Sequence, residues 1–300
     1  MDYNEYKNFK ENTTHGNTML PFEKYFSSIP NFFPFYPLHW HDEIEVIYVK
    51  NGHGTVTVNL TQYMVQTGDI VFISPGLLHS IGQFETEYMD YDTLVFHTSM
   101  LISYPPDACS LHYLGPLQHN ELFLPVHIAP DDLLYPQIQS FIVELIQLYE
   151  TKPSSYELKL KSYLLLVLHT LFSNQRVLSG HKVSSADSRI EKLKQIIKYI
   201  EDNYQKELYI NDIAELCGFS SSHFMKFFKS NMGLTFTQYI NDYRLNQASL
   251  LLTTTDLPIL DIAFESGYDN LSYFNRIFKN KFHMTPKAFR KHENPSYTEF

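Results

Sequence analysis

Three histidines and a glutamate in the first third of the chain have the residue types of a metal site or a polar ligand site. His39, His41, Glu43 and Glu45 are spaced two residues apart, so on one β-strand their side chains would share a face. His79, on a neighbouring strand, would complete a set of three imidazoles and a carboxylate, which transition metals accept. The same groups hydrogen-bond small molecules, and such a pocket suits a hydroxylated ligand better than a fatty one.

The elements expected to position these residues are β-strands. From about Phe32 to Phe96, the segments EIEVIYV, GTVTVNL and GDIVFISP either alternate apolar and polar residues or are rich in β-branched ones. Gly, Asn and Pro lie between these segments. From Asp131 the apolar spacing becomes helical. A second helix over residues 156–173 is apolar nearly all round at 163–168, so it must be buried on more than one side. It packs either within its own domain alone or also against a second copy of the chain.

A second group of candidate residues belongs to an internal duplication near the C-terminus. Ile213-Ala214, Gly218-Phe219, Phe224 and Phe228 recur as Ile262-Ala263, Gly267-Tyr268, Phe274 and Phe278, with one inserted residue. Each copy has the features of two packed helices. The small Ala permits close approach, the Gly ends the first helix in a left-handed conformation, and Ser220 or Asp269 would cap the second.

The second helix of each copy has apolar residues on its inner face and mainly polar or basic residues on its outer face. The outward residues are Ser221, Ser222, Met225, Lys226 and Lys229 in the first copy, and Asn270, Leu271, Ser272, Asn275, Arg276 and Lys279 in the second. A short helix with such a face suits the DNA major groove, so we expect these residues to bind DNA.

The segment GYDNLSYFNRIFKNKFHMTPKAFR closely resembles the C-terminal motif of AraC/XylS transcription regulators, and the resemblance spans about residues 189–291. It implies two helix-turn-helix units, joined by a helix over about 236–253, that enter successive major grooves on one face of DNA. It also implies base-facing positions for Ser222, Met225, Lys226, Leu271, Ser272, Asn275 and Arg276.

Two features depart from the usual family pattern. His283 stands where the family usually has Gly, although Gly233 keeps the glycine in the first copy. Met225 and Leu271 cannot donate hydrogen bonds, so part of the sequence readout would be methyl contact or DNA shape.

Residues 38–79 resemble the two cupin motifs, through His39, His41, Glu45 and Gly52, then Gly68-Asp69-Ile70 and the segment PGLLH ending at His79. The resemblance implies a small antiparallel β-barrel, which is the usual sensor domain of AraC-type regulators. Neighbouring aromatic residues would stack on a flat ligand or a sugar face, or form core; they are Trp40, Tyr48, Phe72 and Tyr91.

Two functions from different classes follow from this barrel. In the first, a small effector, with a sugar as the leading candidate, is bound by His39, Trp40, His41, Glu45 and His79. In the second, the same histidines and glutamate hold a metal in a cupin enzyme fused to a DNA-binding module. We expect the first function, effector binding without catalysis, cofactor or metal. A DNA-binding module needs a ligand signal to control it more than it needs a catalysed reaction.

Charge and composition set the remaining expectations. Residues 1–186 hold 9 Lys+Arg and 19 Asp+Glu, whereas residues 187–300 hold 14 of each, so a basic face can form on a neutral domain despite the net charge of −10. Cys109 and Cys217 fit no disulfide or zinc framework. With no long apolar run for a membrane span or signal peptide, we expect a cytoplasmic protein.

The sequence therefore predicts an α+β multidomain protein. We expect a cupin-like antiparallel β-barrel at residues 1–130, supporting or dimerisation helices at 131–174, a polar linker at 175–187 and an all-α double helix-turn-helix domain at 188–300. We expect a regulator, and an activator by family habit, that binds promoter DNA as a homodimer. RNA polymerase is a candidate partner, and no membrane contact is expected.

Overall fold

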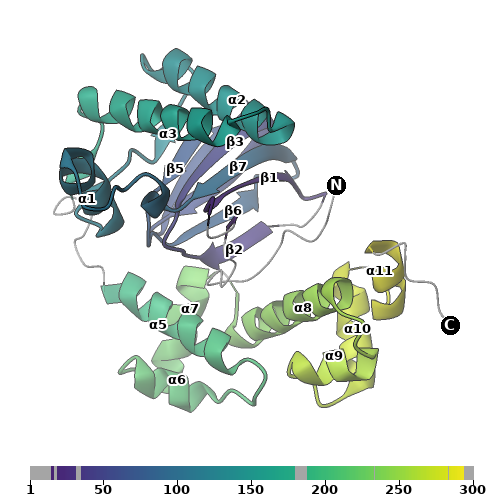
Figure 1. The fold of residues 1–300 in the computed structure, drawn as a ribbon. Helices are drawn as coiled ribbons and strands as arrows, with labels where there is room; N and C mark the ends of the chain where they lie inside the picture. Colours follow the sequence, from purple (N-terminus) through teal and green to yellow (C-terminus); the bar gives the residue numbers. More distant parts are fainter. Residues whose placement is uncertain are drawn as a thin grey trace. The chain divides into compact units, whose positions relative to one another are not determined.

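The computed structural model describes residues 15–16, 19–31, 35–179, 188–232, 234–282 and 284–293. The chain divides into two compact units, residues 14–190 and 191–300, each described by itself. Figure 1 shows the long strands gathered in the first unit and a series of helices in the second. Among the described residues, none of the helices combines the length and apolar character that crossing a bilayer requires.

The first unit is built on antiparallel strands that share one long member, β3 (Figure 1). One sheet has the order β1-β7-β3-β5-β9, and β3 also pairs with β4 and with β6, which in turn pairs with β2. The strands are β1 Phe22–Ile29, β2 Phe35–His39, β3 Ile44–Val58, β4 Thr61–Gln66, β5 Ile70–Ile73, β6 His79–Gln83, β7 Met89–Phe96, β8 Leu122–Phe123, β9 His127–Ile128 and β10 Leu178–Ser179. The described pairings form sheets that meet at β3 without closing into a ring.

The alternating sequence of β3 explains why it serves two cores. Val46 faces a core shared with the helices, while Ile47 and Val49 face a second core, and all three are buried. The predicted antiparallel β fold is thus confirmed. The sheet begins earlier than expected, because β1 precedes Phe32 and pairs along its whole length with β7.

Two long helices, α2 Tyr135–Thr151 and α3 Tyr156–Ser173, cover one face of the sheet (Figure 1). Leu145 and Leu164 are buried in the core that also holds Val46 of β3. The first helix starts at Tyr135 rather than near Asp131, because Asp132 forms a turn in which its carboxylate accepts from the Leu134 N–H. Shorter helical segments precede it: η2 Thr98–Met100, η3 Ser110–Leu114 and α1 Gly115–Gln118.

The second unit contains the duplicated helix pairs. Its helices are α5 Ser188–Asn203, α6 Ile210–Leu216, α7 Ser221–Met232, α8 Phe236–Thr254, α9 Ile259–Glu265, α10 Leu271–Phe282 and α11 Pro286–Glu293. The two predicted pairs are α6–α7 and α9–α10, joined by α8. A capping box fixes the start of α8, because Thr235 accepts from the Gln238 N–H and the Gln238 side chain accepts from the Thr235 N–H.

The turns within the two pairs follow the predicted chemistry with one correction. Gly218 and Gly267 both adopt the left-handed conformation, with φ of 67° and 82°. Ser220 caps α7, since its Oγ accepts from the His223 N–H at 3.3 Å. The cap of α10 is Asn270 and not Asp269: its Oδ1 accepts from the Tyr273 N–H at 2.8 Å, because α10 begins one residue later than assumed. Gly233 and His283 lie outside the described residues.

Candidate functional sites

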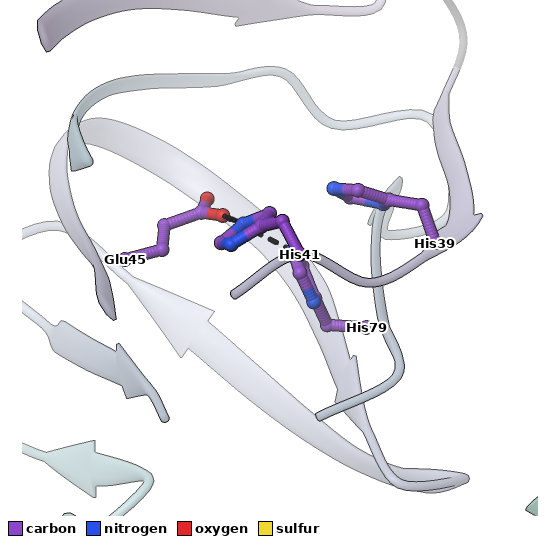
Figure 2. Close-up of side chains that lie close together, drawn as sticks. All are labelled: His39, His41, Glu45 and His79. Carbon is purple, nitrogen blue, oxygen red and sulfur yellow. Dashed lines mark hydrogen bonds and ion pairs between the residues drawn. The ribbon is translucent and has the colours of Figure 1, made fainter. Parts of the chain in front are cut away.

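Four polar side chains meet at one end of the strand-built unit. His39 ends β2 and pairs with His79 at the start of β6, Glu45 is the second residue of β3, and His41 lies in the connection between β2 and β3. One ligand atom from each residue can be chosen so that all four lie within 4.8 Å of one another, and no residue of the four is more than 5% exposed (Figure 2). We call these residues the histidine cluster.

The cluster contains the predicted residues. They do not, however, come together by lying two residues apart along one strand. β2 ends at His39, the chain bends at Asp42 and Glu43, and β3 begins at Ile44. The expectation that all the side chains share one strand face was therefore wrong. Glu43 is outside the cluster, although its carboxylate lies 3.6 Å from the His41 Nδ1.

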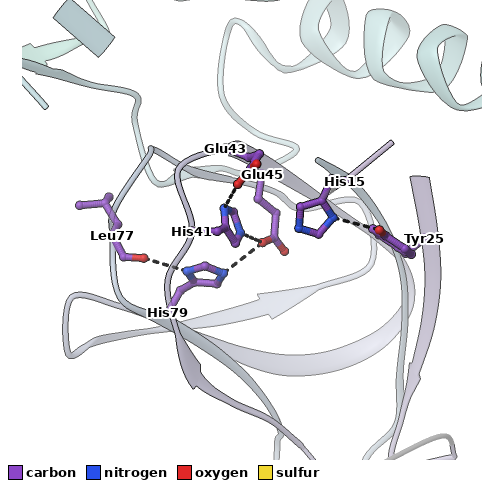
Figure 3. A network of polar contacts seen from close by, with 7 residues as sticks. All are labelled: His15, Tyr25, His41, Glu43, Glu45, Leu77 and His79. Carbon is purple, nitrogen blue, oxygen red and sulfur yellow. Dashed lines mark hydrogen bonds and ion pairs between the residues drawn. The ribbon is translucent and has the colours of Figure 1, made fainter. Parts of the chain in front are cut away.

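Glu45 is the centre of the contacts within the cluster. Its Oε2 lies 2.9 Å from the His41 Nε2 and 3.0 Å from the His79 Nε2 (Figure 3). Burial alone would raise the pKa of Glu45, but the opposing charge and hydrogen bonds of His79 and His41 hold that pKa well below its usual range. The carboxylate is therefore the negative centre of a buried site.

The hydrogen bonds of His79 restrict its ring to one orientation. Its Nδ1 lies 2.8 Å from the Leu77 carbonyl oxygen, which can only accept, so Nδ1 carries a proton. In the neutral ring, Nε2 would then point a lone pair at the Glu45 carboxylate. The contact is therefore favourable only with a proton or a cation between the two groups.

The histidine cluster fits a divalent transition metal by several criteria. It offers three nitrogens and one oxygen, and a backbone carbonyl holds His79 in the manner typical of metal-ligating histidines. The nitrogens of His41 and His79 lie 2.9 and 3.0 Å from the same Glu45 oxygen, so these three atoms are close enough together to bind one ion. Such an ion would supply Lewis-acid chemistry, and the four residues would hold it.

The predicted aromatic lining is mostly core. Phe72 and Tyr91 are buried in the two different cores, and Tyr48 packs beside the core that contains Phe72. Trp40, beside the histidine cluster in sequence, is partly exposed. These rings therefore do not form one ligand-stacking wall.

Sequence reasoning missed His15. It is 2% exposed, its ring centroid lies 5.7 Å from that of His41, and its Nδ1 lies 2.9 Å from the Tyr25 hydroxyl (Figure 3). No strand pattern or motif surrounds it, so the sequence carried no signal for this contact.

The second candidate site is the outer surface of α7 and α10. Phe224, Phe228, Phe274 and Phe278 are fully buried, which fixes the opposite faces outward. The exposed predicted residues are Ser222, Met225, Lys226, Lys229, Asn270, Ser272, Arg276 and Lys279, while Asn275 is partly buried. Arg276 lies 5.4 Å from the Tyr273 ring centroid, a cation–π contact that orients its guanidinium.

Three predicted residues of this surface have structural partners as well. The Ser221 hydroxyl donates to Asn211 on α6 at 2.6 Å, Asn270 caps α10, and Leu271 packs against the core of the second helix pair. Their side chains are thus engaged within the unit in this structure.

Two family descriptions match the chain, one in each unit. "AraC-like ligand binding domain" matches residues 33–168, and "Helix-turn-helix domain" matches residues 213–292. A ligand-binding sheet domain followed by duplicated helix-turn-helix pairs defines a DNA-binding transcription regulator. The chain belongs to the AraC family of these regulators, as its sequence motifs predicted.

Similar proteins include regulators matched over nearly their whole length. The HTH-type transcriptional regulator YdeC of Bacillus subtilis is 27% identical over 95% of this chain and 97% of its own. The HTH-type transcriptional activator RhaR of Mannheimia succiniciproducens is 26% identical over 86% of this chain and 88% of its own. The solved C-terminal domain of the response regulator yesN from Fusobacterium nucleatum is 32% identical, covering 33% of this chain and 98% of that domain, with a TM-score of 0.32.

Proposed function

We propose that this regulator activates transcription by placing α7 and α10 in the major groove of promoter DNA. The observation that carries the proposal is the duplicated helix pair whose second helices bury phenylalanines and expose polar and basic residues. Activation is supported by the similarity to RhaR, which is an activator. Titration of the full chain against DNA upstream of its own gene, compared with unrelated DNA at several salt concentrations, tests the proposal.

The proposed roles divide between base contact and phosphate contact. Ser222, Met225, Lys226, Leu271, Ser272, Asn275 and Arg276 would face bases, while Lys229 and Lys279 would face phosphates. Ser221 and Asn270 would support the helix starts beside the DNA. Arg276 is the strongest candidate for base readout, because guanidinium groups bond guanine edges in bidentate fashion.

We propose that the sheet-rich unit controls DNA binding through a small effector, with a sugar as the first candidate. His39, His41, Glu45 and His79 offer hydrogen-bonding groups that hydroxyls satisfy, and Trp40 offers a partly exposed ring beside them. The effector would change the population of arrangements in which DNA binding is possible, and no turnover is needed for this role. A thermal-shift screen against sugars tests the class, since a ligand of the native state raises the melting temperature.

A metal-dependent cupin enzyme fused to the DNA-binding unit is a second candidate function. The observation that favours it is the convergence of the His41 and His79 nitrogens on one Glu45 oxygen inside a closed site. A stoichiometric metal in protein purified without an affinity tag, together with conversion of a small substrate, would support the enzyme. Bound metal without conversion of any substrate would instead indicate a metal-containing sensor.

We further propose a homodimer formed through α3. Leu164 and Leu168 are buried within the unit, whereas Leu165 and Leu166 on the same helix are 43% and 40% exposed. These outward leucines are the residues that a second copy would cover. Because the regulator acts on DNA, we propose that it works in the cytoplasm.

The proposed organisation keeps a ligand-binding part at 1–130, helices at 131–174, a linker at 175–187 and the DNA-binding part from 188. Two observations refine this division. The helices share a core with the sheet, and Leu178–Ser179 of the linker pair with β8 as strand β10. Residues 180–187 lie outside the described residues.

A further inference from the structure

The first residues of the linker are held by a short strand pair in the ligand-binding unit. Leu178 and Ser179 of β10 pair with Phe123 and Leu122 of β8. Leu178 is 41% exposed, and Ser179 is exposed as well. A two-residue pair with exposed side chains contributes little free energy, so a small change in its surroundings can open or close it.

Strand β8, in contrast, is anchored to the turn that joins β5 to β6. Phe123 packs in the same core as Leu77, and the N–H of Leu124, directly after β8, donates to the Ser74 Oγ at 2.9 Å. Ser74 and Leu77 both lie in this turn, residues 74–78, which we call the β5–β6 turn. The position of β8 therefore depends on the position of the turn.

The β5–β6 turn also holds two members of the histidine cluster. Its Gly76 N–H donates to the His41 carbonyl oxygen at 2.7 Å, and its Leu77 carbonyl oxygen accepts from the His79 Nδ1 at 2.8 Å (Figure 3). Both are hydrogen bonds of normal length. One turn of five residues thus contacts the cluster and also the strand to which the linker is paired.

We propose that the β5–β6 turn couples ligand binding at the histidine cluster to the pairing of β10 with β8. A ligand bound by His41, Glu45 and His79 would hold the turn in one position, which stabilises β8 and with it the β10 pair. Because coupling between two sites is reciprocal, a paired β10 would in turn favour ligand binding. This inference rests on the proposed function, since it describes how the effector signal reaches the linker.

The pairing of β10 sets the point at which the chain leaves the ligand-binding unit. Opening the pair would add Leu178 and Ser179 to the free connection, which is up to about 7 Å of extended chain. In a dimer that binds two half-sites, a longer and less oriented connection lowers the effective concentration of the second DNA-binding unit. The paired state is therefore the state that binds such DNA more tightly.

Hydrogen exchange of the full chain, followed by mass spectrometry, tests the coupling without DNA or effector. His79→Ala removes the hydrogen bond to the turn, so residues 122–123 and 178–179 should exchange at least about tenfold faster than in the parent. The matched control is His53→Ala. It removes a histidine of the same unit that pairs with Glu87, and it should leave exchange at both segments unchanged.

Ser74→Ala tests the other end of the turn without changing a cluster residue. It removes the acceptor of the Leu124 N–H and should also speed exchange at residues 178–179. In both variants, β9 should stay within about twofold of the parent, because it pairs with β5. Unchanged exchange at residues 178–179 in both variants would overturn the inference. So would equal acceleration in β9, which would indicate general loosening of the sheet.

A disulfide across the strand pair tests the consequence for DNA binding. Leu122→Cys with Ser179→Cys, in a chain that also carries Cys109→Ser, places two cysteines at paired positions. His79→Ala should bind DNA from upstream of the gene at least about threefold more weakly than the parent, and oxidation of the disulfide in that variant should restore binding.

The same chain without Ser179→Cys is the control and should not respond to oxidation. An oxidised chain that binds DNA no better than the reduced one would overturn the inference. A parent chain that binds no DNA would instead remove the proposed function, and the exchange measurements would still decide whether the turn couples the cluster to β10.

Discussion

Arg244 of α8 lies directly against Gly267, the residue that ends α9. A Cβ atom on Gly267 would come within 2.8 Å of the Arg244 Nε and 2.6 Å of the Tyr204 carbonyl oxygen. Arg244 is fixed in this position, because its Nε and Nη2 donate to the carbonyls of Tyr204 and Lys206, each at 2.7 Å. Position 267 therefore requires glycine for two reasons: its φ is positive, and a side chain there would have no room.

Replacing this glycine should cost more than replacing its counterpart in the first pair. Gly218→Ala should lower the free energy of unfolding by about 1–2 kcal/mol, because φ is positive but nothing lies within 4 Å of the new Cβ. Gly267→Ala should cost roughly 3 kcal/mol or more, since backbone and the Arg244 hydrogen bonds must also shift. Urea unfolding of both variants measures the difference, and equal costs would show that the contact is unimportant.

The proposed division of the DNA interface predicts two different mutant behaviours. Arg276→Ala should cost about 1–3 kcal/mol on the preferred sequence and less on other sequences, if its guanidinium reads a base edge. Lys229→Ala should weaken binding to all sequences alike and reduce the salt dependence. Fluorescence anisotropy on specific and unrelated DNA measures both effects. A uniform loss for Arg276→Ala would assign that residue to phosphate.

Metal binding at the histidine cluster has a direct chemical test. Protein purified without a metal-affinity tag should be titrated with Co²⁺, whose absorption spectrum reports ligand number and type. If the cluster binds the ion, His41→Ala should lower the affinity by at least about tenfold, because one of four ligands is lost.

His127→Ala is the matched control for that titration. This histidine lies in the same unit, beside Asp69 and outside the cluster, so its loss should leave the Co²⁺ spectrum unchanged. A parent protein without a saturable Co²⁺ signal would leave the organic effector as the remaining ligand proposed for the cluster.

The proposed dimer predicts that a charge on α3 separates the subunits. Leu165→Asp in the full chain should convert dimers to monomers in sedimentation experiments, because an unpaired carboxylate would be buried in the interface. Leu133→Asp is a suitable control, since Leu133 is 94% exposed in the loop before α2. A parent chain that sediments as a monomer at micromolar concentration would remove the dimer proposal.

The helical half was largely predictable because the residues that end each helix, and those that define its buried face, lie within the helix or next to it in sequence. Gly218 and Gly267 mark helix ends by their backbone freedom, and the phenylalanine spacing fixes the inner faces. The cap of α10 was misplaced by one residue because Asp269 and Asn270 both have side chains that cap well.

The sheet-rich half was predictable in residue type but less so in geometry. The motif gave the members of the histidine cluster, yet the bend at Asp42 and Glu43 that brings His41 to Glu45 depends on tertiary contacts. β1 was missed because its burial does not alternate: Ser27, Ser28 and Ile29 are buried in succession. His15 reaches the cluster through a contact with no local pattern.

In the proposed binding mode, the single helix α8 would set the spacing between the two DNA sub-sites. Its start packs against Phe228 through Phe236 and Tyr239, and its later residues Leu245 and Leu252 lie in the core of the second pair. Its 19 residues span roughly 28 Å at 1.5 Å each, comparable to the about 34 Å of one DNA turn. One inserted base pair between the two sub-sites would rotate them by about 35° relative to each other. Binding through both α7 and α10, as proposed, would therefore require an operator whose sub-sites keep a fixed helical phase, whatever their base sequence.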